Sequence, residues 1–408
     1  MEYHFGSYPV NSYMSTISSD RPALVLAPHL LYPTRNGADI YVDRMAREIS
    51  RKVSYVVVVG ASHTLRYESG KEVSRTIMAI SKRSKWVAAA RTVLFKSHYF
   101  KEKFITPTYS TAAVAQYKSD DYGMVLFSYI VSAVLIKKLS ISPTSKAIVL
   151  THNDEFKWFK DVKLKSKNPL GKMVARASTA WLTSYFSKRN DDVKFVHVSD
   201  SDLAGYAQWL NDSNSVVIPL GTDIPDSPVP PRAPNSRPCS VLFVGSLGIG
   251  MNGDALEHFA NKYYPILKAE IDPIVRIAGS NPSSRIQTLC QQHGWEFHPN
   301  ISDEALRVLF EKSDAAILPF EYSTGSKLKL LASISHGVPF LATNEVDPPV
   351  NFVFPPSLVS NEPQQWLSAL TEINRNGISE DQRDQLYLTA KGHSWGHSAD
   401  QLFQIFQD

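Results

Sequence analysis

The chain alternates short apolar runs with longer amphipathic stretches. In its first half the apolar runs are ALVLAP (23–28), SYVVVVG (54–60), GMVLFS (123–128), AIVLT (147–151), KFVHVS (194–199) and SVVIP (215–219). Helical periodicity fills several of the stretches between them, most clearly 38–52 and 169–188. Short apolar strands separated by helices are typical of a parallel sheet that is covered on both faces.

The same alternation restarts after a proline-rich stretch. Residues 221–238 contain six prolines and no periodicity, which indicates a linker. Beyond the linker, strands are expected at 240–246, 273–279, 295–298, 314–320 and 338–343. Ser302 followed by two acidic residues predicts the start of a helix at 302–313. The amphipathic stretch at 394–407 predicts a terminal helix that docks on the rest of the molecule.

These patterns predict an α/β protein with two doubly wound, Rossmann-like parallel-sheet domains. At 408 residues the chain is too long for one hydrophobic core. The expected organisation is a loosely ordered arm at 1–22, a first domain at 23–220, the linker at 221–238, a second domain at 239–390 and a terminal segment at 391–408. Such folds bind ligands at the carboxyl ends of their strands, so a cleft between two facing sheets is the expected site.

Composition narrows the possible function classes. With 43% apolar and 20% charged residues, the chain is typical of soluble globular proteins. Its two cysteines are too few for a disulfide framework or a zinc site, which favours a reduced, cytoplasmic compartment. No apolar run reaches the roughly 20 residues of a membrane span. The N-terminus also lacks the basic start and apolar middle of a signal peptide.

The net charge of +4 conceals an asymmetry between the two halves. Residues 1–220 carry 30 Lys and Arg against 18 Asp and Glu, whereas the rest of the chain carries 13 against 21. The segments 81–104 and 157–189 concentrate this positive charge and interleave it with aromatic residues. They fit a solvated surface or peripheral contact with an anionic membrane, here the inner face of the cytoplasmic membrane. A nucleic-acid groove is the third possibility, but no nucleic-acid-binding module accompanies the charge, so nucleic acid is not the expected partner.

The clearest candidate chemistry lies in EYSTGSKLKLLASISHGVPFLAT (321–343). Gly325, Ser326 and Lys327 stand at the start of a predicted helix that follows a strand. Free backbone N–H groups, the helix dipole, a hydroxyl and an ammonium group together make an anion site. Lys329, two residues on, is expected to point to another part of the helix surface. An ordinary helix start with surface lysines is the alternative interpretation.

Two more glycine-bearing loops are predicted at the same edge. Asn36 and Gly37 enter the helix at 38–52, where a glycine permits close approach of a ligand to the backbone. The sequence FVGSLGIGMNGDALEHF (243–259) forms a glycine-rich turn after the first strand of the second half, with only a loose likeness to a dinucleotide fingerprint. Three such loops at one cleft strengthen the prediction of a phosphate site.

From about residue 23 to 407 the chain resembles the GT-B glycosyltransferases, specifically glycosyltransferase family 4, the glycosyl transferases group 1. In the second half the resemblance is carried by VLFVGSLGIGMNGDALEHFANKYYPIL, VRIAGSNPS, EFHPNISDEALRVLFEKSDAAILPF and GSKLKLLASISHGVPFLAT. In the first half, YPTRNGADIYVDRMAREIS resembles the family's glycine loop and THNDEF (151–156) resembles its His-bearing loop. The terminal helix resembles the family's Ser-Trp helix, which typically crosses back onto the N-terminal domain.

The resemblance implies roles for the positions that match. His152 and Lys327 are the expected catalytic residues, and Asn36, Asp154 and Glu155 are candidate acceptor contacts. Donor binding is expected from Gly37, Gly245, Ser246, Pro299, Ile301, Glu321, Thr324, Gly325, Ser326 and Lys327. From the residues alone, a core role for His152, loop-tip charges at Asp154 and Glu155 and a solvated Glu321 remain open.

The chain departs from the family pattern at three of these positions. Ser246 replaces an Arg that is often found there. Thr324 and Ala332 stand where many members carry a Glu-x7-Glu pattern, whose second Glu binds the ribose hydroxyls. A hydrogen bond to a charged group contributes about 1.5–3 kcal/mol, so donor binding must replace or forgo that contact. The alternative to an enzyme is therefore a catalytically silent subunit of the same fold, which binds glycan or supports an active partner.

If the chain is an enzyme, the resemblance implies transfer of a sugar from a nucleotide-sugar donor to a glycan or lipid-linked acceptor, in the biosynthesis of bacterial surface polysaccharide or a related glycoconjugate. The expected outcome is retention, with electrostatic stabilisation of the leaving diphosphate. No cluster has metal-ligand spacing, so neither a metal nor another cofactor is expected. An epimerase on the same fold would need cleft carboxylates that the sequence does not place.

Overall fold

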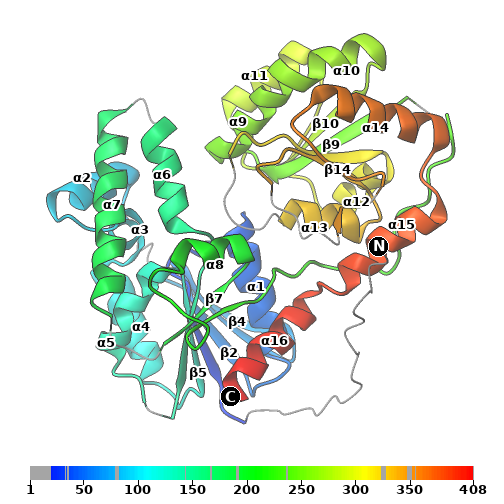
Figure 1. Cartoon of the computed structure of the whole chain (residues 1–408). Coiled ribbons are helices and arrows are strands. Elements are labelled where there is room, and N and C mark those ends of the chain that lie inside the picture. The colour runs from blue at the N-terminus through cyan, green and yellow to red at the C-terminus, as the bar shows by residue number, and fades with distance from the viewer. Residues whose placement is uncertain are drawn as a thin grey trace.

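The computed structural model describes residues 20–32, 34, 36–78, 82–142, 144–165, 168–189, 193–235, 238–322, 328–346, 352–353 and 355–407. Within these residues the chain forms two α/β domains, each built around one sheet, as the hydrophobic pattern predicts (Figure 1). Among the described helices, none is both long and apolar enough to cross a bilayer.

The N-terminal domain contains an eight-stranded sheet in the order β4-β3-β2-β1-β5-β6-β7-β8. All neighbouring pairs are parallel except β2 with β3 and β3 with β4. The apolar residues of β1 and β2 are buried on both faces, as expected for a sheet covered by helices on both sides. The strands are β1 (Ala23–Leu26), β2 (Val56–Val59), β3 (His63–Glu68), β4 (Lys71–Ile77), β5 (Met124–Ser128), β6 (Lys146–Leu150), β7 (Lys194–His197) and β8 (Ser215–Val217).

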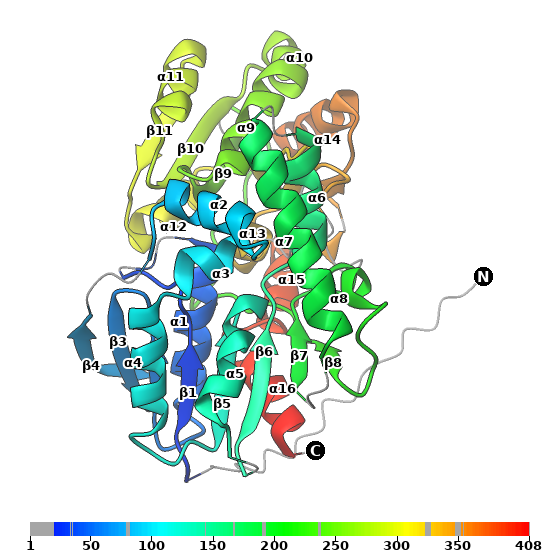
Figure 2. The same ribbon diagram turned by 90° about the vertical axis from the view of Figure 1, so that its left-hand side faces the viewer.

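Helices surround this sheet, and α2 and α7 lie side by side on one face of the domain (Figure 2). Asn36, Ser84, Thr106 and Asn168 cap the starts of α1, α2, α4 and α7, each through a side-chain oxygen that accepts a bond from a first-turn N–H. The elements are α1 (Gly37–Ile49), α2 (Lys85–Leu94), α3 (Tyr99–Phe104), α4 (Pro107–Tyr117), the 3₁₀ segment η1 (Ile130–Leu135), α5 (Ile136–Leu139), α6 (Glu155–Lys165), α7 (Pro169–Ser187) and α8 (Asp200–Tyr206).

The β3–β4 hairpin is absent from the sequence prediction. Its turn residues Ser69 and Gly70 both have positive φ, of 47° and 81°, as a tight hairpin turn requires. The flanking residues pair in antiparallel register from His63 with Ile77 to Glu68 with Lys71. The hairpin extends the sheet beyond β2, and Arg75 of β4 lies 3.3 Å from the ring centroid of Tyr32 in the loop before α1.

The C-terminal domain contains a six-stranded, fully parallel sheet in the order β11-β10-β9-β12-β13-β14. All five predicted strands are present. The strands are β9 (Ser240–Ser246), β10 (Ile274–Ser280), β11 (Glu296–Pro299), β12 (Ala315–Leu318), β13 (Phe340–Ala342) and the short β14 (Leu358–Val359). The helical elements are α9 (Gly250–His258), the π-helical segment η2 (Phe259–Tyr263), α10 (Tyr264–Glu270), α11 (Ser284–His293), α12 (Asp303–Glu311), α13 (Leu328–Ser335), α14 (Pro363–Asn376) and α15 (Glu380–Lys391).

The last helix, α16 (Trp395–Gln407), leaves the C-terminal domain and packs along α1 of the N-terminal domain (Figure 1). Lys52 hydrogen-bonds Asp400, and the Ser398 hydroxyl donates to the carbonyl of Pro219 at 2.8 Å. The Trp395 ring is 4% exposed and lies 6.0 Å from the ring of Tyr41 on α1. The crossing predicted for the terminal helix is therefore confirmed, and it joins the two domains through a second connection.

Candidate functional site

The starts of α1 and α13 meet where the two domains face each other. A Cβ atom on Gly37, the first residue of α1, would lie 3.3 Å from Cδ1 of Leu328, the first described residue of α13. Asn36 caps α1: its Oδ1 accepts from the Asp39 N–H at 3.1 Å, and its Nδ2 donates to the Asp39 carboxylate at 2.7 Å. Because α1 follows β1 and α13 follows β12, the carboxyl edges of both sheets converge here, as predicted.

Thr324, Gly325, Ser326 and Lys327 lie outside the described residues, so their donor-binding roles stay predictions. The two residues before this segment, Glu321 and Tyr322, contact side chains of α9. The Tyr322 hydroxyl donates to Asp254 at 2.5 Å, and Asp254 also pairs with Arg285 at 2.8 Å. Glu321 lies 3.4 Å from Nδ1 of His258 and is half exposed, so its predicted contact with the sugar would compete with this partner.

The remaining donor-side positions line up at the carboxyl edge of the C-terminal sheet. Gly245, Gly279 and Pro299 are register partners across β9, β10 and β11. The N–H of Asn300 donates to the Gly279 carbonyl at 2.8 Å, which holds the loop at 299–301 against β10. Ile301, by contrast, packs partly buried on an apolar cluster with Leu242 and Ala278. The sequence thus places Gly245, Ser246 and Pro299 at one edge, as its strand pattern predicts.

The side chain of Lys329 also reaches this edge of the C-terminal sheet. From the sequence, it is expected to point to another part of the helix surface than Lys327. Its Nζ would lie 3.1 Å from a Cβ atom on Gly245 and donates to Asn252 Oδ1 at 2.8 Å. Nδ2 of Asn252 in turn donates to the carbonyl of Ser246 at 2.7 Å. An ammonium group therefore stands beside the turn that follows β9.

On the N-terminal side, His152 follows β6 and lies in a cluster of aromatic rings. Its Nε2 is 2.6 Å from the hydroxyl of Ser128, the last residue of β5. The Tyr129 ring stacks on it with a centroid distance of 4.1 Å, and the rings of His29 and Tyr41 meet it edge-on at 5.3 and 5.2 Å. Three segments, namely the loop after β1, α1 and the end of β5, thus hold one imidazole at the carboxyl edge, near the start of α1.

Both histidines of this cluster are neutral at pH 7. Burial lowers the pKa of His29 to about 3, against a weaker opposing backbone hydrogen bond with Ala38. Burial, with the adjacent His29, also lowers the pKa of His152 well below 6.5. A neutral imidazole carries one donor and one acceptor, which suits the hydroxyl groups of a sugar better than a phosphate.

Tyr129 has a backbone conformation that is unusual for a non-glycine residue. Its φ is 68° and its ψ is 147°, and its N–H donates to the Leu150 carbonyl at 2.9 Å. Such conformations cost about 1–3 kcal/mol and are often found at functional sites. Here the strained bend turns the Tyr129 ring from the end of β5 onto the face of His152.

Asp154 and Glu155 are buried rather than exposed charges at a loop tip, and their contact with an acceptor stays a prediction. They are 8% and 1% exposed, respectively. Asp154 accepts from the Lys157 N–H at 3.0 Å and so holds the first turn of α6. Glu155 lies 2.9 Å from Nε2 of the buried His98 on the adjoining segment. Both carboxylates therefore help to hold the start of α6 in place.

Ala332, the position without the ribose-binding Glu, packs partly buried on the apolar cluster formed by Leu242, Ala278, Phe310 and neighbouring residues. Its carbonyl lies 2.7 Å from Nδ1 of His336. Ala332 lies on the side of α13 that faces β9 and β10. Its methyl group packs there on apolar side chains and offers no hydrogen bond to a ligand.

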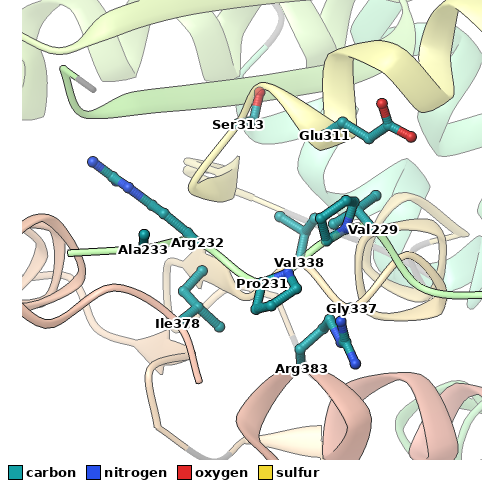
Figure 3. Close-up of a pocket in the computed structure, with 11 residues that line it drawn as sticks. Val229, Pro231, Arg232, Ala233, Glu311, Ser313, Gly337, Val338, Ile378 and Arg383 are labelled. Atoms are coloured by element: carbon teal, nitrogen blue, oxygen red, sulfur yellow. The ribbon is translucent and has the colours of Figure 1, made fainter. Parts of the chain in front are cut away.

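A separate cavity of about 310 Å³ lies at the opposite, amino edge of the C-terminal sheet (Figure 3). Its lining comes from segments that precede β9, β12 and β13 and from α15: Val229, Pro230, Pro231, Arg232, Ala233, Glu311, Ser313, Gly337, Val338, Ile378 and Arg383. The buried Arg232 pairs with Asp314 at 2.6 Å and ties the linker to the domain. This cavity lies at the amino ends of the strands, away from the residues described above. Folds of this type bind their ligands at the carboxyl ends of the strands, so the cavity is not the expected donor site.

Residues 238–374 match the family model of the Glycosyl transferases group 1. The two domains together have the GT-B fold. The chain superposes on sucrose-phosphate synthase (tll1590) from Thermosynechococcus elongatus with a TM-score of 0.67 and 15% identity, over 95% of this chain and 98% of that one. WaaG, a glycosyltransferase involved in lipopolysaccharide biosynthesis, superposes with a TM-score of 0.61 and 14% identity, over 94% of this chain and 99% of that one. Anabaena Alr3699/HepE in complex with UDP-glucose superposes with a TM-score of 0.59 and 11% identity, over 95% of this chain and 99% of that one.

No curated protein sequence matches the chain. The matched domain and the fold together support a glycosyltransferase of the GT-B type, the class that the sequence predicts.

Three residues near this site, namely His29, Tyr129 and Lys329, are not among those that the sequence predicts. The first two had a usable signal, because each comes within a few residues of the end of a strand that the pattern predicts correctly. Lys329 had none, since its long side chain crosses from α13 to the β9 turn only in the folded domain.

Proposed function

We propose that the chain transfers a sugar from a nucleoside diphosphate sugar to a glycan or lipid-linked acceptor, with retention at the anomeric carbon and without a metal. One observation carries this proposal: the start of α1, with Gly37, faces the start of α13, with Leu328, across the domain boundary. Two helix starts at one place favour a diphosphate, because the dipole of each helix stabilises negative charge at its start.

The proposed reaction breaks the bond between the anomeric carbon and the diphosphate oxygen, which keeps the electron pair. The acceptor hydroxyl oxygen forms the new bond on the same face of the sugar, and its proton passes to the leaving diphosphate. Lys327 and the amides of α13 stabilise the charge that develops on the diphosphate. His152, neutral and held by Ser128, hydrogen-bonds a hydroxyl of the reacting sugar.

The structural relatives guide the choice of ligands. The solved complexes of HepE contain UDP and UDP-glucose, so uridine diphosphate sugars are the first donors to test. WaaG is involved in lipopolysaccharide biosynthesis, which supports an acceptor of the surface-polysaccharide class. Because Ala332 offers no carboxylate to the ribose, donor affinity is expected to depend mainly on the diphosphate.

Calorimetric titration with UDP, GDP and dTDP tests the donor site. We expect one of them to bind with a micromolar dissociation constant and Lys327→Ala to weaken it about 10- to 100-fold, as expected for loss of a bond between charged groups. The variant Lys268→Met, which changes an exposed lysine on α10, is the control and is expected to bind as the unmodified chain does. No binding of any diphosphate at millimolar concentration would favour the silent subunit instead.

We further propose that the basic face of the N-terminal domain contacts an anionic membrane, at the inner face of the cytoplasmic membrane. On α2, Trp86, Leu94 and the adjoining Phe95 are 62%, 75% and 61% exposed. Trp86 and Leu94 are eight residues apart and so lie on one side of the helix. Lys82, Lys85 and Lys96 around them are exposed, as are Lys172 and Arg176 on the neighbouring α7. Exposed apolar side chains among cations suit the interface of an anionic bilayer.

Sedimentation with vesicles tests the membrane contact. Binding to vesicles that contain anionic lipid is expected to fall as salt rises from 50 to 500 mM, because salt screens exposed charges. The double variant Trp86→Ala, Leu94→Ala is expected to bind several-fold less. Leu388→Ala, which removes a 61% exposed side chain from α15, is expected to have no effect. Equal binding to neutral and anionic vesicles would contradict the proposal.

A further inference from the structure

We propose that Lys329 is a second cation of the donor site and binds the diphosphate from the side of β9. This inference rests on the proposed function, since it assigns a residue to the same ligand. It concerns a residue that the sequence places away from the site. The structure instead brings its ammonium group to the turn after β9.

The first support is position. Lys329 is the second residue of the described part of α13, next to Leu328, which faces Gly37. Its Nζ would lie 3.1 Å from a Cβ atom on Gly245. Since any side chain at position 245 would crowd this ammonium, the glycine leaves open the space between the backbone and the charge. The cation therefore stands between two predicted donor-binding elements, the start of α13 and the end of β9 at Gly245 and Ser246.

The second support is that the ammonium is held in place before any ligand arrives. Asn252 bridges it to the sheet: Oδ1 accepts from Nζ at 2.8 Å, while Nδ2 donates to the Ser246 carbonyl at 2.7 Å. The rings of Phe243 and Phe320 flank Nζ, with centroids at 4.7 and 4.6 Å. A lysine that is ordered by folding loses less conformational entropy on binding than a mobile surface lysine.

The third support is chemical. Ser246 provides no charge at this turn, so a diphosphate that reaches the β9 side needs its cation from another element. Lys329 reaches the turn from α13 and lies in a half-buried environment. Charge pairs are stronger there than at an exposed surface, because the effective dielectric constant is lower. In the proposed reaction, Lys329 would stabilise the leaving diphosphate from the side of β9.

Titrations of three variants test this assignment with the nucleoside diphosphate that the unmodified chain binds best. Lys329→Met, which keeps the length of the side chain but removes its charge, is expected to weaken diphosphate binding about 10- to 100-fold. It is also expected to reduce the dependence of affinity on salt. Lys329→Arg is expected to restore part of the affinity, and Lys268→Met, on α10, is expected to change nothing.

Titration with the corresponding nucleoside, which has no phosphate, distinguishes loss of the Lys329 charge from misfolding of the variant. Lys329→Met is expected to bind the nucleoside as the unmodified chain does and to unfold cooperatively. If it loses nucleoside and diphosphate binding equally, or if it binds the diphosphate with full affinity and unchanged salt dependence, the assignment of Lys329 is overturned and the proposed function still stands. If the unmodified chain binds no nucleotide, the proposed function itself fails.

Discussion

Gly279→Ala is expected to lower the free energy of unfolding by about 4 kcal/mol and to abolish nucleotide binding. Gly279 has a φ of 153°, and a Cβ atom there would lie 1.7 Å from the carbonyl oxygen of Gly245 on the neighbouring strand. The expected cost combines backbone strain, about 1–3 kcal/mol, with overpacking, also about 1–3 kcal/mol. Because the clash is with backbone, β9 and β10 must separate at the edge where the donor is proposed to bind.

Urea denaturation measures the loss of stability, and Gly294→Ala is the matched control. Gly294 ends α11 with a φ of 69°, but a Cβ atom there would meet nothing within 4 Å. Gly294→Ala is expected to lower the free energy of unfolding only by the cost of a left-handed conformation, about 1–2 kcal/mol. It is expected to bind nucleotide as the unmodified chain does. Equal destabilisation by the two substitutions, with nucleotide binding intact in both, would contradict the packing described for Gly279.

His152→Ala is expected to reduce the rate of sugar transfer about 10²- to 10³-fold while diphosphate affinity stays within a few-fold. The removed imidazole is neutral and is proposed to hydrogen-bond the reacting sugar rather than the phosphates. Loss of one preorganised hydrogen-bond donor from an active site typically has an effect of this size. The measurement is turnover with the donor that calorimetry identifies, followed under saturating conditions.

His197 provides the matched control for His152. It ends the next strand, β7, is 0% exposed, and lies with Nδ1 3.0 Å from the Thr151 hydroxyl. His197→Asn is expected to lower stability but to keep the transfer rate within a few-fold, since this ring lies in the interior. A comparable loss of rate in both variants, or a loss of diphosphate affinity in His152→Ala, would contradict the role given to His152.

The fold was largely predictable because its strands are buried on both faces. Fully apolar runs such as 240–246 are distinct in the sequence, and β9 has the predicted bounds. The β3–β4 hairpin escaped because β4 is mostly exposed and carries charged residues, so it lacks the apolar signal of the other strands. The Ser69–Gly70 turn was the one local signal that could have revealed it.

The site was only partly predictable, because much of it depends on tertiary packing. Gly37 and His152 follow predicted strands and Gly245 lies near the end of one, so the order of elements alone places them at the carboxyl edges. By contrast, Glu155 looks exposed in the sequence and is 1% exposed in the structure, since α3 and α6 enclose it with His98. The reach of a long side chain such as Lys329 likewise depends on which elements pack beside it.

Hydrogen exchange with and without a saturating nucleoside diphosphate tests the central claim most directly. We expect slower exchange in residues 325–330, which include the first described residues of α13, and at the same time at the start of α1, in residues 36–40. The amides of α11 are expected to exchange unchanged. The account is contradicted if a bound diphosphate leaves both helix starts unprotected, or if protection is confined to the cavity at the amino edge, around 229–233 and 378–383.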